Sequence, residues 1–272
     1  MAGDVTCKAI VCSAYGGPEV LKISTKTIPP PSKGEIRVRI CAAGINPSDT
    51  YVRLGPSGPY AGTKLLPDLP FTPGKDGAGI VESVGSGQPS RFSPGDRIYL
   101  YGSISGTYAE YALCKEEQVF ALPSNVSMLQ GACMGVPGFT AYRGLFQRCQ
   151  VKPGEVVLIH GASGAVGLAA VQLAVASGCT VVGTAGTFAG CEAVRAAGAH
   201  AVVCHRDEGY VEAARAATPR GEGFDVCLEM MASSNLPSDL GLMKRGGRAG
   251  RDRGLKVGDG PRQPEGGDAA GA

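Results

Sequence analysis

The chain has 272 residues, with 26 basic and 24 acidic side chains, a formal net charge of +2 and an apolar fraction of 43%. These values are ordinary for a protein with one large or two modest domains, and the balanced charge argues against nucleic acid or membrane as the main partner. Because no apolar run is long enough to span a bilayer and the N-terminus lacks the layout of a secretory signal, we expect a soluble cytoplasmic protein.

The first half of the chain is predicted to be rich in β-strands. In Ile36–Ile40 apolar residues alternate with Arg37 and Arg39, which predicts a strand with one buried and one solvated face. One helix is expected to begin after Asn46 as its N-cap and to end before Gly55. Short runs bounded by Gly and Pro predict strands at Lys8–Ser13, Leu21–Ser24, Ile36–Ala42, Ala78–Val84, Arg97–Tyr101, Tyr108–Cys114 and Val119–Ala121.

After Ser124 the pattern becomes helical and then alternates strands with helices, which predicts a parallel sheet. The helix at Gly164–Ser177 has almost no polar residue, so we expect it to be covered on both sides. The predicted helices are Ser127–Gly135, Pro137–Phe146, Gly164–Ser177, Ala189–Ala197 and Tyr210–Thr218, and the predicted strands are Val156–His160, Thr180–Thr184, Ala201–Cys204 and Val226–Met230.

A glycine-rich turn follows the first of these parallel strands. Val156–His160 leads into Gly161-Ala-Ser-Gly164-Ala-Val-Gly167 and then into a helix, which is the arrangement that a dinucleotide diphosphate requires. Gly161 would permit the turn, Gly164 would let phosphate approach, and Gly167 would let helix and strand pack closely. A packing turn without a ligand is the alternative, but packing alone needs one glycine rather than three.

The second parallel strand ends without a carboxylate. NAD-specific sites carry an Asp or Glu there for the ribose 2′-hydroxyl, whereas this chain has Thr184-Ala-Gly186-Thr187. His205 and Arg206, after the third strand, could help to neutralise a 2′-phosphate, so NADPH is favoured over NADH. On those two residues alone, a solvated loop pair is an equally good interpretation.

The ten cysteines lie mostly inside apolar runs, as Cys41, Cys179 and Cys204 do, and we expect reduced thiols. No Cys-x-x-Cys occurs, and the three histidines are not spaced from cysteines as zinc ligands are, so no structural zinc is expected.

Seven motifs, spread from Lys8 to about Arg248, resemble the zeta-crystallin-like NADPH:quinone oxidoreductases of the medium-chain dehydrogenase/reductase superfamily. They are Gly16–Leu21, Gly44–Tyr51, Asp76–Gly85, Gly106–Tyr111, Phe139–Tyr142, His160–Gly164 and Gly183–Thr187. The resemblance implies an α/β protein in which a GroES-like substrate domain precedes a Rossmann domain, with NADPH reducing a quinone in the cleft between them.

The resemblance also implies cofactor contacts beyond the three glycines. Taken together, the expected cofactor-binding residues are Tyr51, Gly161, Ser163, Gly164, Ala165, Val166, Gly167, Gly186, Thr187, His205, Arg206 and Asn235.

The zinc enzymes of the same superfamily hold a catalytic metal at positions that correspond here to Asn46 and Lys75. An amide and an ammonium group are not zinc ligands, so no metal is expected. The expected substrate is a quinone or a related electron-poor carbonyl compound, positioned by Asn46, Asp49 and Tyr51 as catalytic residues. Helix capping by Asn46 and first-turn charge from Asp49 are the alternative, and they can coexist with a site role. Lys75 departs from the small polar residue expected in quinone reductases.

Beyond Arg248 the resemblance ends, because the family continues with an apolar fifth strand and this chain with a Gly-rich, charged segment. We expect four parallel strands, an incomplete Rossmann domain, an uncovered apolar edge at Val226–Met230 and a C-terminally truncated or frame-altered form. The expected domains are a GroES-like domain at 1–124, a partial Rossmann domain at 125–248 and a disordered tail at 249–272.

A second functional class remains open. Zeta-crystallin-like proteins also bind AU-rich messenger RNA and serve structurally in lenses, so a catalytically impaired binding protein is the alternative. The family forms homotetramers, which the missing sheet edge makes doubtful for this chain.

Overall fold

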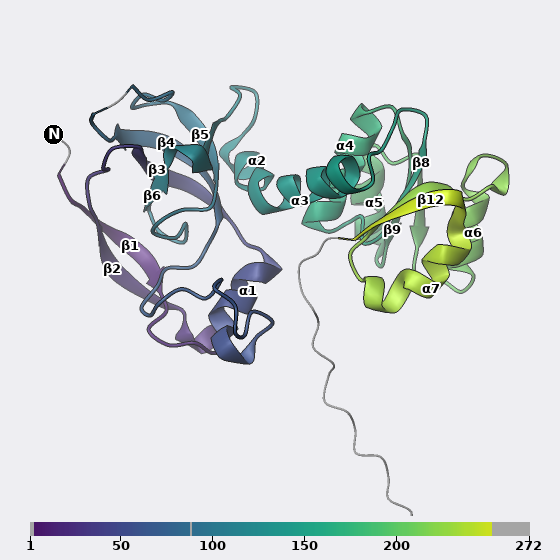
Figure 1. The fold of residues 1–272 in the computed structure, drawn as a ribbon, viewed down its shortest axis with the longest axis horizontal. Helices are drawn as coiled ribbons and strands as arrows, with labels where there is room; N and C mark the ends of the chain where they lie inside the picture. The colour runs from purple at the N-terminus through teal and green to yellow at the C-terminus, as the bar shows by residue number, and fades with distance from the viewer. Residues whose placement is uncertain (1–2, 88, 252–272) are drawn as a thin grey trace, which may run out of the picture.

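The computed structural model of the chain describes residues 3–87 and 89–251, without the side chains of 232–234 and 251. It consists of two bodies joined through a helical segment (Figure 1). The strands are β1 (Val5–Val11), β2 (Lys22–Ile28), β3 (Glu35–Gly44), β4 (Asp76–Val84), β5 (Arg97–Tyr101), β6 (Tyr111–Lys115), β7 (Val119–Ala121), β8 (Val156–Ile159), β9 (Thr180–Ala185), β10 (Ala201–Cys204), β11 (Phe224–Glu229) and β12 (Met243–Arg251). The α-helices are α1 (Pro47–Leu54), α2 (Met128–Ala132), α3 (Phe139–Tyr142), α4 (Ala165–Ala176), α5 (Phe188–Ala196), α6 (Tyr210–Ala216) and α7 (Ala232–Leu242).

The first body is an antiparallel sheet of order β6-β3-β4-β5-β7, beside the two-stranded pair β1-β2. Its core contains Ile36, Val38 and Ile98, which are fully buried. Helix α1 runs from Pro47 to Leu54 and is followed by Gly55 as its C-cap, whose φ of +58° glycine tolerates without strain, so the predicted helix is confirmed.

The prediction that one face of β3 is solvated is wrong at Arg37. Its side chain is only 1% exposed, because the guanidinium donates to Glu82 at 2.7 Å and to the carbonyl oxygens of Gly3 and Ile28. Apolar alternation therefore located the strand correctly, but it could not reveal that a paired arginine is buried on the other face.

The second body is a parallel sheet of order β10-β9-β8-β11-β12 with helices on both faces. Along β8, Val157 and Ile159 face the cluster formed with α3, α4 and α5, whereas Val156 and Leu158 face the cluster formed with α6 and α7. This is the doubly wound arrangement that strand and helix alternation predicted.

A fifth parallel strand is present, so the prediction of four strands and of an uncovered edge at Val226–Met230 is wrong. Strand β12 pairs with β11 from Phe224 to Glu229. Ala249–Arg251, predicted as part of a disordered tail, lie in this strand, and residues 252–272 of that predicted tail lie outside the described residues. The described part of the sheet ends at β12, and the doubt about a tetramer stays a prediction.

The segment that joins the bodies is helical, as predicted, but irregular. Between α2 and α3 the stretch Met134–Gly138 is π-helical around Pro137, which has no N–H to donate, and Arg143–Arg148 is π-helical as well. Among the helices of the described residues, none is both long and apolar enough to cross a membrane. All ten cysteines are free, as predicted.

Candidate active site

The turn after β8 has the geometry that its three glycines predicted. Gly161 adopts a φ of +57°, and its N–H donates to Thr184 Oγ1 at 3.2 Å. The N–H of Ala162 donates to the carbonyl of the same threonine at 2.8 Å, which ties the turn to β9. A Cβ on Gly167 would lie 2.4 Å from the carbonyl oxygen of Gly161, so this position requires glycine for close packing.

The first turn of α4 presents free backbone donors. Gly164 is the N-cap and provides no side chain to cap the helix. The first intrahelical bond runs from the N–H of Leu168 to the carbonyl of Gly164 at 2.8 Å, so the N–H groups of Ala165, Val166 and Gly167 have no intrahelical acceptor. A Cβ on Gly164 would meet only the Gly161 oxygen, at 3.3 Å. The helix start is therefore open to an anion, and the helix dipole favours one there.

An imidazole and a guanidinium group lie over Gly186, directly after the end of β9. A Cβ on Gly186 would lie 2.6 Å from His205 Nε2 and 3.2 Å from Arg206 Nε. Both side chains are exposed, and the His205 N–H donates to the carbonyl of Ala185 at 2.9 Å, which fixes the loop beside β9. The structure thus brings together the residues predicted to surround a 2′-phosphate.

Ser163 and Thr187 meet at the start of α5. Thr187 Oγ1 accepts from the N–H of Gly190 at 3.0 Å and so caps the helix. A Cβ on Gly190 would lie 3.0 Å from that hydroxyl and 3.1 Å from the Ser163 Oγ, which shows that both hydroxyls are close to the same backbone position.

Two other predicted cofactor contacts lie on helices outside this turn, although Asn235 is linked to it through Glu229, whose Oε2 lies 3.6 Å from Nε2 of His160. Asn235 lies on α7, and its amide donates to both carboxylate oxygens of Glu229, at 3.2 and 3.3 Å. Tyr51 lies on α1 in the first body, where its ring packs edge-on against Tyr60 with the centroids 5.8 Å apart.

The predicted catalytic pair Asn46 and Asp49 is buried in a hydrogen-bond network. Asp49 Oδ2 accepts from the backbone N–H of Asn46 and from the Tyr108 hydroxyl, both at 2.9 Å. Burial raises the pKa of Asp49, while those two donors and the charge of Lys75 lower it. Asp49 therefore completes the capping box of α1, and its role in the site stays a prediction.

Asp76, which was not predicted as a site residue, anchors Asn46. Its Oδ2 accepts from Asn46 Nδ2 at 2.7 Å, and its Oδ1 accepts from the Val136 N–H at 2.8 Å, across the junction of the two bodies. Asp76 is completely buried, and burial raises its pKa from 3.8 to about 6 despite these donors.

A cavity of about 410 Å³ opens next to this network, and Asp49 and Lys75 both line it. The Lys75 ammonium lies 6.0 Å from the centroid of the Tyr60 ring, against which Tyr51 packs. The cavity lining therefore combines apolar side chains with the carboxylates of Asp49 and Asp68 and the amino groups of Lys26 and Lys75, which suits a small polarised ligand.

The comparisons with known proteins agree with this geometry. Residues 32–124 match the family described as the alcohol dehydrogenase GroES-like domain, and residues 165–250 match the one described as zinc-binding dehydrogenase. The chain is 44% identical to the quinone oxidoreductase of Homo sapiens over 247 residues, which is 90% of this chain and 73% of that protein. The chain belongs to the quinone oxidoreductase family. It is an oxidoreductase of the medium-chain dehydrogenase/reductase superfamily.

Relatives of this quinone oxidoreductase family extend to bacteria. The chain is 35% identical to quinone oxidoreductase 1 of Escherichia coli, covering 86% of this chain and 68% of that protein. A solved structure of the Escherichia coli quinone oxidoreductase complexed with NADPH has a TM-score of 0.77 and 33% identity, covering 92% of this chain and 75% of that one. The GroES-like and Rossmann architecture is thereby confirmed, and the alternative of a non-catalytic binding protein receives no support.

Asp76 and Tyr108 entered the sequence analysis only as members of the motifs Asp76–Gly85 and Gly106–Tyr111, and neither was assigned a role in the site. The available signal for Asp76 was a carboxylate at the start of an apolar strand, where a lone charge has to find partners. Tyr108 is recognisable only after folding, because its partner Asp49 is 59 residues away.

Proposed function

We propose that the chain is an NADPH-dependent reductase of quinones or related electron-poor carbonyl compounds. The observation that carries the proposal is the open start of α4, where the N–H groups of Ala165, Val166 and Gly167 have no intrahelical acceptor above a turn shaped by Gly161. At Gly164 no side chain covers these donors, and the similar Escherichia coli structure is complexed with NADPH.

The ends of β9 and β10 support NADPH rather than NADH. The place where a ribose-binding carboxylate would stand is occupied by Gly186, with His205 and Arg206 over it. A 2′-phosphate would gain a permanent guanidinium partner from Arg206. Ser163 and Thr187 offer hydroxyl groups beside it.

When bound, NADPH supplies the hydride that reduces the substrate. The cavity next to Asp49 receives the substrate, whose apolar part would lie against Val52, Leu65 and Phe71. Asn46 and Asp49 hold the cavity wall through Asp76 and Tyr108, so their role is to position it. Tyr51 and Lys75 lie near the cavity as hydrogen-bond donors for the oxygen that gains negative charge.

We also propose that the chemistry needs no zinc at the position used by the zinc dehydrogenases. Asn46 directs its amide nitrogen, a donor, at Asp76, and the ammonium of Lys75 carries no lone pair for a metal. An electron-poor carbonyl accepts a hydride without a Lewis acid, which agrees with a donor-lined site.

The test is to follow NADPH absorbance after mixing the purified chain with a small ortho-quinone. We expect turnover in the wild type, and its loss in Gly164→Asp, because the carboxylate would face the diphosphate. Gly164→Asn, of similar shape but uncharged, should retain more NADPH affinity than Gly164→Asp. If both variants bind NADPH as the wild type does, the cofactor does not bind at this turn and the proposal is wrong.

A further inference from the structure

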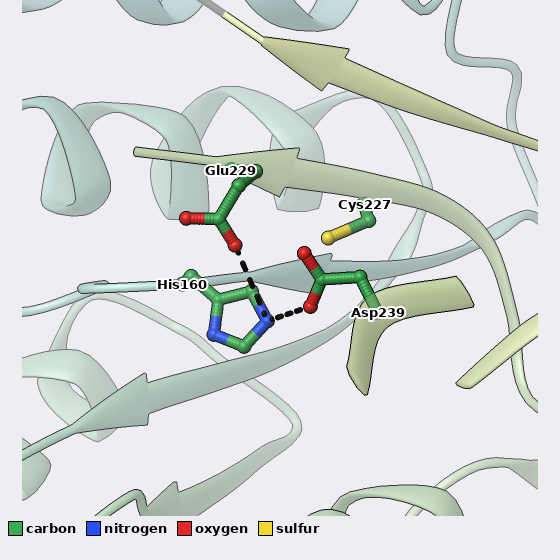
Figure 2. A group of neighbouring side chains, drawn as sticks. All are labelled: His160, Cys227, Glu229 and Asp239. Carbon is green, nitrogen blue, oxygen red and sulfur yellow. Dashed lines mark hydrogen bonds and ion pairs between the residues drawn. The ribbon is translucent and has the colours of Figure 1, made fainter. Parts of the chain in front are cut away.

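Four side chains with metal-ligating atoms meet on the face of the parallel sheet that packs against α6 and α7, outside the site described above. They are His160, directly after β8, Cys227 and Glu229 in β11, and Asp239 in α7 (Figure 2). All four are buried, with Cys227 and Asp239 completely so. Their nitrogen, sulfur and oxygen atoms all lie within 4.8 Å of one another.

The fold brings these residues together by strand alternation. Cys227 lies in the cluster on the α6 and α7 face, and Glu229, two residues further along β11, points to the same face. His160 follows Leu158 by two residues on β8, so it faces the same side, and α7 places Asp239 opposite. Sequence spacing could not reveal this group, because His160 and Asp239 are 79 residues apart.

The charges in this group do not balance. His160 Nε2 lies 2.8 Å from Asp239 Oδ1 and 3.6 Å from Glu229 Oε2, so a single imidazole faces two buried carboxylates. Even a protonated imidazole would neutralise only one of them, and an unpaired buried charge is costly.

One acceptor in the group is unused. Asp239 Oδ2 is buried and has no hydrogen-bond partner. By contrast, the oxygens of Glu229 accept from the Met231 N–H and from the Asn235 amide. Because the side chains of Glu229 and Asp239 are also hydrogen-bonding partners of each other, Asp239 Oδ2 requires either a proton shared between the two carboxyl groups or a cation.

We propose that this group is a structural site for a divalent metal ion of the zinc class, held by His160 Nε2, Cys227 Sγ and one carboxylate oxygen each from Glu229 and Asp239. Ion binding would release the proton of the Cys227 thiol, so two positive charges would offset two of three negative groups, and mixed nitrogen, sulfur and oxygen donors suit zinc. Ligand atoms around tetrahedral zinc are roughly 3.3 to 3.8 Å apart. The most widely separated atoms of the group, up to 4.8 Å apart, would therefore close by about 1 to 1.5 Å, and the His160–Asp239 pair, now at 2.8 Å, would open.

The geometry around the group supports a structural role. His160 Nδ1 lies 3.4 Å from Thr184 Oγ1, the hydroxyl that also accepts from the Gly161 N–H. An ion would therefore join β8, β11 and α7 directly beneath the dinucleotide turn. The proposal does not depend on the proposed reductase activity, and the site differs from the zinc position of the zinc dehydrogenases.

The test uses the full chain, dialysed against a chelator and then titrated with Zn²⁺ and with Co²⁺. We expect one ion per chain, a melting midpoint raised by roughly 5 °C or more with Zn²⁺, and a Co²⁺ spectrum with a sulfur-to-metal charge-transfer band. Cys227→Ala should abolish that band and weaken Co²⁺ binding at least about tenfold. The control Cys133→Ala, at an exposed cysteine, should change neither.

Asp239→Asn provides a second variant in case Cys227→Ala folds poorly, and Zn²⁺ should no longer raise the melting midpoint of Asp239→Asn. An NADPH titration of each variant reports whether the dinucleotide turn remains intact. If the wild type binds no stoichiometric Zn²⁺ or Co²⁺, or if the charge-transfer band persists in Cys227→Ala, shared protons rather than a metal hold this group together and the proposal is overturned. Absence of quinone turnover with metal binding intact would contradict only the reductase proposal.

Discussion

At the scale of single residues, the glycines of the turn differ in what a side chain would meet. A Cβ on Gly167 would lie 2.4 Å from a backbone oxygen of Gly161, whereas one on Gly164 would lie 3.3 Å from the same atom. Sequence spacing could mark both as important, but only the folded turn separates a packing glycine from one that keeps room for a ligand.

Gly167→Ala is therefore expected to destabilise the chain by about 1–3 kcal/mol, because the helix start would have to move away from the turn. Gly164→Ala should leave the unfolding free energy nearly unchanged and weaken only NADPH binding. Urea unfolding of both variants, with NADPH titration, checks this. Equal losses of stability in the two variants would contradict the assignment.

Asp76 makes the stability of the chain depend on pH. Its pKa is raised to about 6 in the folded state by burial, above the ordinary 3.8 of the unfolded state. Below about pH 4 the Asp76 carboxyl is protonated in both the folded and the unfolded state. Between about pH 4 and 6 only the folded state holds the proton, so the unfolding free energy falls as the pH rises, by about 3 kcal/mol in all. Above pH 6 this contribution is constant.

Asp76→Asn removes this titration, because an amide stays neutral. We expect the stability of this variant relative to the wild type to rise by about 3 kcal/mol from pH 4 to pH 7, whatever fixed cost the altered hydrogen bonds to Asn46 and Val136 impose. Unfolding curves at several pH values measure it. A difference that does not vary with pH would show that Asp76 is not the titrating group.

At the scale of elements, apolar periodicity predicted β8 to β11 and α4 to α6, since each buries a regular face against the sheet. It failed at β12, whose Gly- and Arg-rich sequence carries no such pattern. This strand forms because backbone pairing with β11 is supplemented by polar anchors: Arg248 binds Glu155 at 2.6 Å and the Cys149 carbonyl at 2.7 Å. A local sequence pattern does not predict ion pairs between residues far apart in the chain, and for the same reason it did not predict the burial of Arg37.

Arg248→Met should lower the unfolding free energy by about 1 kcal/mol, a modest loss because the arginine is partly exposed. It should also increase aggregation, because β12 would cover the apolar strand β11 less firmly. The matched control is Arg245→Met in the same strand, whose exposed side chain should change stability by less than about 0.5 kcal/mol. Chemical unfolding and light scattering distinguish them. Indistinguishable variants would mean that the Glu155 pair does not hold β12.

At the scale of the whole molecule, the proposed cofactor turn lies in the parallel body and the substrate cavity in the antiparallel one, joined by the contacts of Asp76 with Val136. The resemblance predicted this division, and the matched relatives and structures confirm the architecture. The site was less predictable, because Asn46, Asp76 and Tyr108 become one network only after three separate segments fold together.

Because a ligand that binds only the native chain raises its melting midpoint, NADPH should stabilise the protein more than NADH at equal concentration. In Thr187→Asp, NADH should stabilise more than NADPH, because the variant keeps the cap on α5 and adds a carboxylate near Arg206. The control Thr187→Asn keeps the cap without the charge, so NADPH should still stabilise it more than NADH. Thermal melts with each nucleotide give the result. Equal shifts in all three proteins would contradict the proposed 2′-phosphate contact.

The register between β11 and β12 has a consequence for self-association. Phe224 pairs with Met243 and Val226 with Arg248, so the residues between Met243 and Arg248 bulge out of the ladder, with Gly246 at a φ of +81°. Strand β12, the edge strand of this sheet within the described residues, is therefore interrupted by a bulge that contains the exposed Arg245. An interrupted edge strand is a poor template for fibril growth, so seeding by preformed cross-β aggregates should be inefficient at β12.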